Sequence, residues 1–143
     1  MSESYQLGRK GEAEAARFLT QNNYKILEKN YRYRKAEVDL IVQKNKTLIA
    51  VEIKTRSSDF FGNPALFLKT KQQQRIVEAI NYYVKHNNLD VEVRFDVISI
   101  VKKKGRFEIQ HLKNAFYHFW IKGFKSSKFW GFAMMVFFGS KTI

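Results

Sequence analysis

The chain of 143 residues contains 26 Lys and Arg but only 13 Asp and Glu, and this net charge of +13 favours polyanionic partners. Nucleic acid is therefore the first partner to consider, and an anionic membrane surface the second. The chain has no cysteine, which excludes disulfides, thiolate zinc sites and cysteine nucleophiles and fits our expectation of a cytoplasmic protein. Its length suits a single domain, and a hydrophobic content of 45% with one proline indicates a globular chain.

The N-terminal part is predicted to form a helix followed by a strand. Apolar and small residues recur at helical spacing from Leu7 to Gln21, and the two asparagines at 22–23 end this helix. The strand is predicted from Tyr24 to Tyr33. Its last part alternates tyrosine rings with the guanidinium groups of Arg32 and Arg34, so that one side of it is basic.

Two acid-bearing strands are predicted next, joined by a turn at residues 44–46. In the first, over residues 37–43, apolar positions alternate with a face that carries acids: Val38, Leu40 and Val42 against Glu37, Asp39 and Ile41. In the second, over residues 47–55, one face is apolar and the other carries charges: Ile49, Val51 and Ile53 against Leu48, Ala50, Glu52 and Lys54. A short turn between two such strands predicts a hairpin.

The remaining elements complete an α/β protein. A loop is predicted over residues 56–68, and then a helix from Thr70 to His86 that opens with a capping box at Thr70 and Gln73. Strands over residues 91–101 and 106–112 flank a basic turn, and a short helix follows over residues 114–120. This order predicts a sandwich in which helices flank a mixed β-sheet.

We expect two parts in the chain, a domain over residues 1–120 and a basic, aromatic tail over residues 121–143. The apolar run of the tail, residues 129–138, is too short to cross a bilayer, which needs about 20 residues in a helix. Three interpretations of the tail are open: docking on its own domain or on a second copy, an interfacial membrane contact, and disorder.

Three charged residues of the predicted hairpin indicate a metal-dependent phosphodiesterase site. Asp39 and Glu52 lie on adjacent strands, and Lys54 shares a face with Glu52 because it follows two residues later. Convergent carboxylates can hold Mg²⁺ or Mn²⁺, which shields the charge of the reacting phosphate and supplies hydroxide near neutral pH. Glu12 of the first helix is a candidate third acid, and Arg56 is a candidate phosphate contact.

A purely structural interpretation of the same residues is also open. Glu52 and Lys54 could form an ion pair on the strand surface, and Asp39 could be a solvated acid near a turn. Against this, both acids interrupt apolar stretches, where a charge is costly unless a metal or another group pairs with it. Within a site, Lys54 could orient or deprotonate the attacking water, or neutralise a phosphate oxygen.

Other polar residues carry weaker signals. The three histidines share no ligand spacing and are expected to be solvated or packed: His86, His111 and His118. Two clusters are candidate nucleic-acid contacts, although a solvated face would look the same: Lys71 with the glutamines at 72–74, and the basic turn of Lys102, Lys103 and Lys104. Arg94 and Asp96 are expected to form a structural ion pair.

A series of short motifs runs through about residues 5 to 118. They are Gly8-Arg-Lys-Gly11-Glu12, Asn30, Arg32, Glu37-Val-Asp39-Leu-Ile41, Val51-Glu52-Ile-Lys54-Thr-Arg56, Phe61-Gly62, Lys71, Arg94-Phe-Asp96 and Ala115-Phe116. Together they resemble the YraN family of bacterial proteins, an uncharacterised branch of the restriction-endonuclease-like PD-(D/E)XK superfamily related to Holliday-junction resolvases. Ala36 departs from the family pattern, which usually has glycine there, so the start of this strand can differ.

The resemblance implies a three-layer sandwich with an αβββαβ core and roles for four residues. In the superfamily, the residues that match Asp39 and Glu52 bind the metal, and the residue that matches Lys54 assists catalysis. The helix acid that matches Glu12 completes the cluster. The tail lies outside the resemblance.

Three functional hypotheses follow. The first is a Mg²⁺- or Mn²⁺-dependent endonuclease acting on DNA, including branched or damaged DNA, with basic contacts from Arg32, Arg34, Arg56, Lys71, Lys102, Lys103 and Lys104. The second is a nucleic-acid-binding module with the nuclease fold but no catalysis. The third is a peripheral membrane or partner-docking role for the tail. A homodimer would suit a cut in both strands of DNA.

Overall fold

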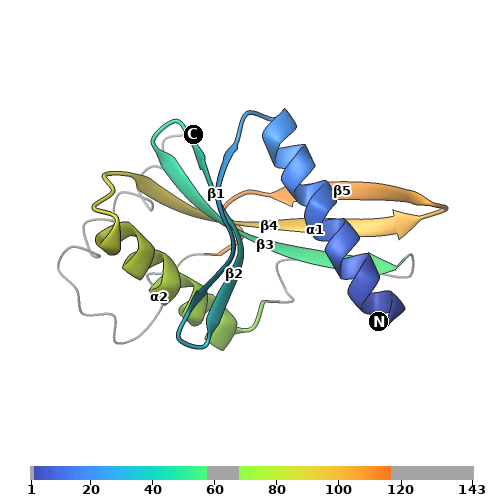
Figure 1. Cartoon of the computed structure of the whole chain (residues 1–143), viewed down its shortest axis with the longest axis horizontal. Helices are drawn as coiled ribbons and strands as arrows, with labels where there is room; N and C mark the ends of the chain where they lie inside the picture. Colours follow the sequence, from blue (N-terminus) through green and yellow to red (C-terminus); the bar gives the residue numbers. More distant parts are fainter. Residues whose placement is uncertain (1, 58–67, 117–143) are drawn as a thin grey trace.

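The computed structural model describes residues 2–57 and 68–116, which form two helices and a five-stranded sheet (Figure 1). The elements in chain order are α1 (Glu3–Gln21), β1 (Lys25–Tyr33), β2 (Ala36–Lys44), β3 (Thr47–Ser57), α2 (Thr70–His86), β4 (Glu92–Lys103) and β5 (Arg106–Leu112). The strands lie side by side in this same order. Only β3 and β4 are parallel, with α2 in the connection between them. The mixed sheet and the predicted αβββαβ order are therefore confirmed.

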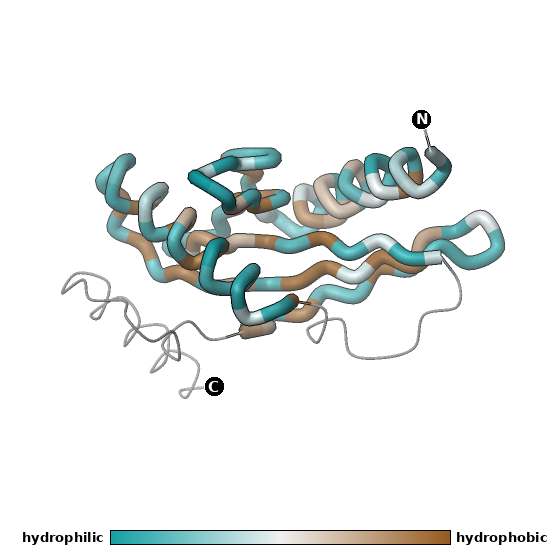
Figure 2. Tube along the Cα trace, turned by 90° about the horizontal axis from the view of Figure 1, so that it is seen from below, coloured by the Kyte–Doolittle hydropathy of each residue, from teal (hydrophilic) through white to brown (hydrophobic). Residues whose placement is uncertain are grey.

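The two helices cover opposite faces of the sheet. Buried residues of α2 such as Ile76 share one core cluster with Leu48 of β3, whereas Leu19 of α1 shares the other cluster with the next residue, Ile49. The predicted two faces of β3 are thus confirmed, because successive strand residues point to opposite sides. Figure 2 shows hydrophobic runs in the strands and mixed colours on the helices, as expected for a sheet buried on both sides. In Figure 1, β1 and β2 run close to vertically, whereas β4 and β5 run close to horizontally. The sheet is therefore strongly twisted.

Helix α1 packs closely on β3 at Gly11. It begins at Glu3, earlier than the predicted Leu7, because the Ser2 hydroxyl caps it by accepting a hydrogen bond from the Tyr5 backbone N–H at 3.3 Å. A Cβ atom at Gly11 would overlap the Thr55 side chain, so this approach requires a glycine. The next residue, Glu12, therefore lies near this contact between α1 and β3.

Strands β2 and β3 separate at Asp39. Their pairing runs from the turn as far as Leu40 and Val51. The predicted alternation in β2 is wrong at this point, since Val38 packs on the α2 side whereas Leu40 and Val42 pack on the α1 side. A regular strand would keep these three residues on one face, so β2 changes face around Asp39.

Several element boundaries differ from the sequence predictions. β3 continues through Ser57, so Arg56 belongs to a strand and not to a loop. Helix α2 is confirmed from Thr70 to His86, but the capping box is wrong: Lys69 is the N-cap, without a side-chain cap bond, and Gln73 donates to the Leu68 carbonyl oxygen at 2.8 Å. Asn114 lies in a turn, so no helix begins there. Residues 58–67, the remaining predicted helix at 117–120, His118 and the tail lie outside the described residues.

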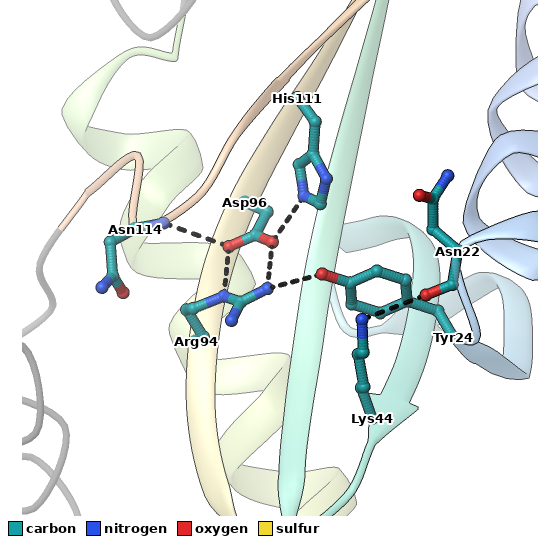
Figure 3. A network of polar contacts seen from close by, with 7 residues as sticks. All are labelled: Asn22, Tyr24, Lys44, Arg94, Asp96, His111 and Asn114. Carbon is teal, nitrogen blue, oxygen red and sulfur yellow. Dashed lines mark hydrogen bonds and ion pairs between the residues drawn. The ribbon is translucent and has the colours of Figure 1, made fainter.

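A buried ionic network joins β4 and β5 to the start of β1 (Figure 3). Asp96 accepts two hydrogen bonds from Arg94, both 2.9 Å, and one from the Asn114 backbone N–H at 3.1 Å, and it lies 2.7 Å from His111 Nε2. Arg94 also donates to the Tyr24 hydroxyl at 3.3 Å. Burial acts to raise the pKa of Asp96, but the hydrogen bonds from His111 and Arg94 outweigh it and lower that pKa. The predicted Arg94–Asp96 ion pair and a packed His111 are confirmed.

Candidate active site

Asp39 and Glu52 meet where β2 and β3 separate. The Asp39 backbone N–H donates to Glu52 Oε1 at 3.4 Å, and the Ile53 backbone N–H donates to Asp39 Oδ2 at 2.8 Å. Side chains thus continue the connection between the strands beyond their last backbone pair, Leu40 and Val51. Because each carboxylate is held by the opposite strand, both are fixed at one position in the sheet.

Both carboxyl groups are costly to ionise. Burial raises the pKa of Glu52 to about 8, and the negative charge of Asp39 adds to this rise. Burial also raises the pKa of Asp39 to about 6, opposed by the hydrogen bond from Ile53 and assisted by the charge of Glu12. The metal-free pair therefore retains a proton near neutral pH, and a cation between the two groups would remove the cost of ionisation.

Lys54 and Glu12 influence this pair through their charges. Lys54 is half-buried on the same face of β3 as Glu52, and its charge opposes the effect of burial on the pKa of both carboxyls. Within residues 2–57 and 68–116, no group of three or more Asp, Glu, His or Cys side chains comes close enough together to hold a metal ion. The described site is therefore a pair of carboxylates with a lysine, and a metal-binding role for Glu12 stays a prediction.

The Asp39–Glu52 pair has the donor chemistry that Mg²⁺ and Mn²⁺ prefer. Mg²⁺ in proteins is usually held by one or two carboxylates and keeps several of its water molecules, so a pair is sufficient. The charge of Asp39 raises the pKa of Glu52, and a divalent cation would compensate the charges of both carboxylates. Asp39 and Glu52 are thus the residues that would hold such an ion.

Helix α2 connects Glu52 to two adjoining pockets. Gln72 Nε2 donates to Glu52 Oε2 at 3.3 Å, and Gln72 also lines a pocket of about 440 Å³ between the first turns of α2 and the turn that joins β1 and β2. A second pocket of about 390 Å³ shares four lining residues with the first: Lys35, Ala36, Lys71 and Arg75. Helical periodicity could not reveal the contact between Gln72 and Glu52, because it depends on how α2 packs against β3.

Cationic side chains dominate the lining of these pockets, which together we call the basic groove. The cations are Arg34, Lys35, Lys69, Lys71 and Arg75, and the acids are Glu37 and Glu78. Two of the predicted nucleic-acid contacts, Arg34 and Lys71, are thus brought together from distant parts of the sequence. A third, Arg32, lies beside the groove and pairs with Glu37 at 3.5 Å.

The other predicted contacts lie along a different edge of the sheet. Arg56 is on the same face of β3 as Lys54, two residues further along. Lys102 pairs in register with Ser57 at the ends of β3 and β4, and Lys103 and Lys104 follow at the turn into β5. Lys103 pairs with Glu108 at 3.3 Å. Arg56 and these three lysines thus lie near the end of β3 that follows Glu52, whereas the basic groove lies beside the two carboxylates.

Comparison with known proteins identifies the family. The family described as "Uncharacterised protein family UPF0102" matches residues 11–100. The chain belongs to UPF0102, the YraN family. It is 53% identical to a UPF0102 protein of Christiangramia forsetii over 83% of this chain and 100% of the relative, and 47% identical to one of Flavobacterium psychrophilum with the same coverage. A UPF0102 protein of Geobacter metallireducens is 41% identical over 77% of this chain and 91% of its own length.

Membership of UPF0102 confirms the resemblance seen in the sequence. The matched region contains Glu12, Asp39, Glu52 and Lys54, which are the residues that carry the candidate site. The UPF0102 description names no activity. Across the described residues, the helices are too short or too polar to cross a membrane.

Proposed function

We propose that this UPF0102 protein is a Mg²⁺- or Mn²⁺-dependent nuclease that hydrolyses phosphodiester bonds in DNA. The observation that carries the proposal is the reciprocal pairing of Asp39 and Glu52 at the point where β2 and β3 separate. Glu52 is buried and Asp39 is half-buried beside it, and two adjacent ionised acids destabilise a fold unless a cation compensates them. A cation-binding role therefore accounts for them better than a purely structural one. Acids with strongly raised pKa values beside a concave, basic surface are typical of catalytic sites.

The residues of the site divide the work of hydrolysis. A bound divalent cation would supply positive charge at the phosphate and hydroxide near neutral pH. Asp39 and Glu52 would hold this ion, and Lys54 would neutralise a phosphate oxygen or orient the attacking water. In the reaction the water oxygen bonds to phosphorus, the bond to the leaving oxygen breaks, and the leaving oxygen takes up a proton.

A second candidate function is nucleic-acid binding without catalysis. The net charge of +13 and the basic groove favour this function as much as they favour a nuclease. It differs in what it requires of the acids. A binding module predicts salt-sensitive binding, no metal-dependent cleavage, and only the effect of a lost negative charge when Asp39 or Glu52 is replaced.

The deciding experiment is cleavage of a labelled panel of duplex, single-stranded, flap and four-way-junction DNA and of RNA, with Mg²⁺ or Mn²⁺. Wild-type protein is compared with Asp39→Asn and Glu52→Gln, purified identically. Glu92→Gln is the matched control, because it removes the same charge from an exposed position at the start of β4. The nuclease predicts cleavage by wild type and Glu92→Gln and its loss in the two site variants, with DNA binding retained.

Two results would contradict the nuclease proposal. Equal cleavage by all four proteins would identify a contaminating enzyme. Absence of cleavage by the wild type on every substrate, together with salt-sensitive binding, would favour the binding module.

The role of the tail is a separate prediction, because residues 121–143 lie outside the described part of the chain. Flotation with anionic liposomes of the full chain and of a chain ending at residue 120 tests for a membrane contact. A truncated chain that floats as well as the full one would contradict it. Sedimentation of both chains tests for the predicted homodimer.

A further inference from the structure

We propose that the basic groove, together with a column of stacked rings beside it, binds an unpaired stretch of the nucleic-acid strand that enters the Asp39–Glu52 site. The inference rests on the proposed function, because it takes from it that the ligand is a nucleic acid. It goes further by assigning a single-stranded segment to the substrate and a path for that segment over the surface.

The groove has the charge and size to hold nucleotides. Its five cations come from two segments, residues 34–35 and 69–75, and outnumber the two acids in the same lining. Each of the two adjoining pockets, of about 390 Å³ and 440 Å³, is as large as a typical small-molecule site. Channels that follow a single strand combine such cationic surfaces with rings on which bases stack.

A column of stacked rings adjoins this groove through Tyr33. The Arg34 guanidinium lies 5.3 Å from the centre of the Tyr33 ring, and Tyr33 stacks on Tyr82 with 4.3 Å between centroids. Tyr82 in turn stacks on His86 at 5.3 Å. Both Tyr33 and Arg34 line the pocket of about 390 Å³, so this pocket combines an aromatic wall with cations.

The column lies at the surface, although Tyr33 also packs against the edge of the core. Tyr83, the next residue of α2, is buried and makes an edge contact with Tyr31 that packs β1 against the helix. Tyr82 is 40% exposed and is one of the most exposed large hydrophobic side chains among the described residues. An exposed ring stack next to a cationic pocket is better explained by a ligand with flat, apolar faces than by packing.

Unpaired bases fit this combination better than a duplex does. In a duplex each base is already stacked between its neighbours, whereas an unpaired base can stack on a tyrosine ring or on a guanidinium plane. Here an incoming base would stack on the Tyr33 ring in place of the exposed Arg34 guanidinium, which now lies over it. The phosphates on either side of that base would meet Lys71 and Arg75.

The groove is connected to the carboxylates through Gln72. This residue bonds to Glu52 and lines the pocket of about 440 Å³, which shares residues with the pocket that reaches Tyr33. A strand whose reacting phosphate lies at Asp39 and Glu52 would therefore continue past Gln72 into the groove. This path predicts that the substrates have an unpaired segment next to the cleavage position.

The test measures binding of the full chain by fluorescence anisotropy in EDTA, where cleavage does not occur, to one oligonucleotide as a single strand and as a duplex. Tyr33→Leu removes the ring that lines the pocket, and Tyr82→Leu removes the ring behind it. Tyr5→Leu is the matched control, because Tyr5 is 50% exposed on α1. The double variant Lys71→Gln, Arg75→Gln is matched by Lys29→Gln, Lys46→Gln, two exposed cations outside the groove lining.

We expect the single strand to bind more tightly than the duplex. Tyr33→Leu should weaken single-strand binding by about tenfold, the typical effect of losing one base–ring stack, and leave duplex binding unchanged. The groove double variant should reduce the slope of log affinity against log salt by about 1.4 for the single strand, whereas the matched double variant should not. A 2-aminopurine base in the strand should be quenched by wild type and not by Tyr33→Leu.

Equal affinity for duplex and single strand, or equal losses in the groove variants and their matched controls, would overturn the inference. Tyr33→Phe, which keeps the ring, should bind as wild type does, so a loss caused by misfolding is recognised from this variant and from thermal melting. Because binding is measured without metal, the inference can fail while metal-dependent cleavage persists. Conversely, single-strand binding without any cleavage would overturn the nuclease proposal alone.

Discussion

The carboxylates of Asp39 and Glu52 each accept a hydrogen bond from the backbone of the opposite strand. The backbone N–H of Asp39 donates to the Glu52 carboxylate at 3.4 Å, and the backbone N–H of Ile53, the residue after Glu52, donates to the Asp39 carboxylate at 2.8 Å. The same arrangement that fixes the two acids brings them side by side, with Glu52 buried and Asp39 half-buried. Their ionisation therefore opposes folding, whereas hydrogen bonding to the backbone favours it. This conflict has consequences for stability that can be measured without knowing the substrate.

The metal-free protein should lose stability as the pH rises from about 4 to about 8. The pKa values of Asp39 and Glu52 are raised to about 6 and about 8, from 3.8 and 4.5, so the folded protein binds these protons more tightly than the unfolded chain does. The stabilising effect is present at low pH and is lost as the pH rises through the folded values. Urea denaturation in EDTA at pH 5 and pH 8 measures the difference.

Glu52→Gln should remove much of this pH dependence. At pH 8 we expect the variant to be more stable than the wild type by a few kcal/mol, because one pKa unit corresponds to about 1.4 kcal/mol. At pH 5 the two proteins should be nearly equal. Glu108→Gln, which removes an exposed carboxylate of β5, is the control and should change stability by less than about 1 kcal/mol. An unchanged pH profile in Glu52→Gln would contradict the buried-pair explanation.

Divalent metal should stabilise the folded protein through the carboxylate pair. Mg²⁺ or Mn²⁺ at 100 times its dissociation constant adds about 2.7 kcal/mol, which appears as an increase in melting temperature. The increase should be larger at pH 8 than at pH 5, because protons compete with the metal for both carboxylates. Scanning fluorimetry of the wild type and of the double variant Asp39→Asn, Glu52→Gln checks this. An equal increase in both proteins would exclude the pair as the metal site.

Gly11→Ala should destabilise the protein by about 1–3 kcal/mol, because its Cβ would overlap Thr55 and force α1 away from β3. Gly8→Ala is the matched control on the same helix, where a Cβ atom meets nothing within 4 Å, and there we expect a gain of about 0.5–1 kcal/mol. Urea denaturation of the two variants checks both signs. Equal stability of the two would contradict the close packing of α1 on β3.

Asp96→Ala should cost about 3–5 kcal/mol, because it leaves the partly buried Arg94 without its ion-pair partner. The pKa of Asp96 is lowered in the folded protein, so its stabilising contribution is present above the unfolded value of 3.8 and is lost as the pH falls through the folded value. Acid titration of wild type and variant, followed by circular dichroism, should therefore show their stabilities converging at low pH. A constant difference across the acid range would contradict an ionic role for Asp96.

Local patterns in the sequence were enough to predict most of the secondary structure and part of the site. The boundaries of α2 and β5 and the two faces of β3 were predicted correctly, because helical and strand periodicity and turn residues act over a few neighbouring positions. The same local rule placed Glu52 and Lys54 on one face, and it placed Arg94 beside Asp96. Charged residues within apolar stretches were enough to single out Asp39 and Glu52.

How these residues meet depends on the way in which distant parts of the chain pack together. The change of face at Asp39, the contact of Gln72 with Glu52 and the position of His111 against Asp96 all depend on strand order and on where each helix packs. The basic groove likewise joins residues 33–37 to residues 69–78, which are far apart in the chain. Periodicity carries no information about such contacts, because they arise when separate elements bury their apolar faces against a common sheet.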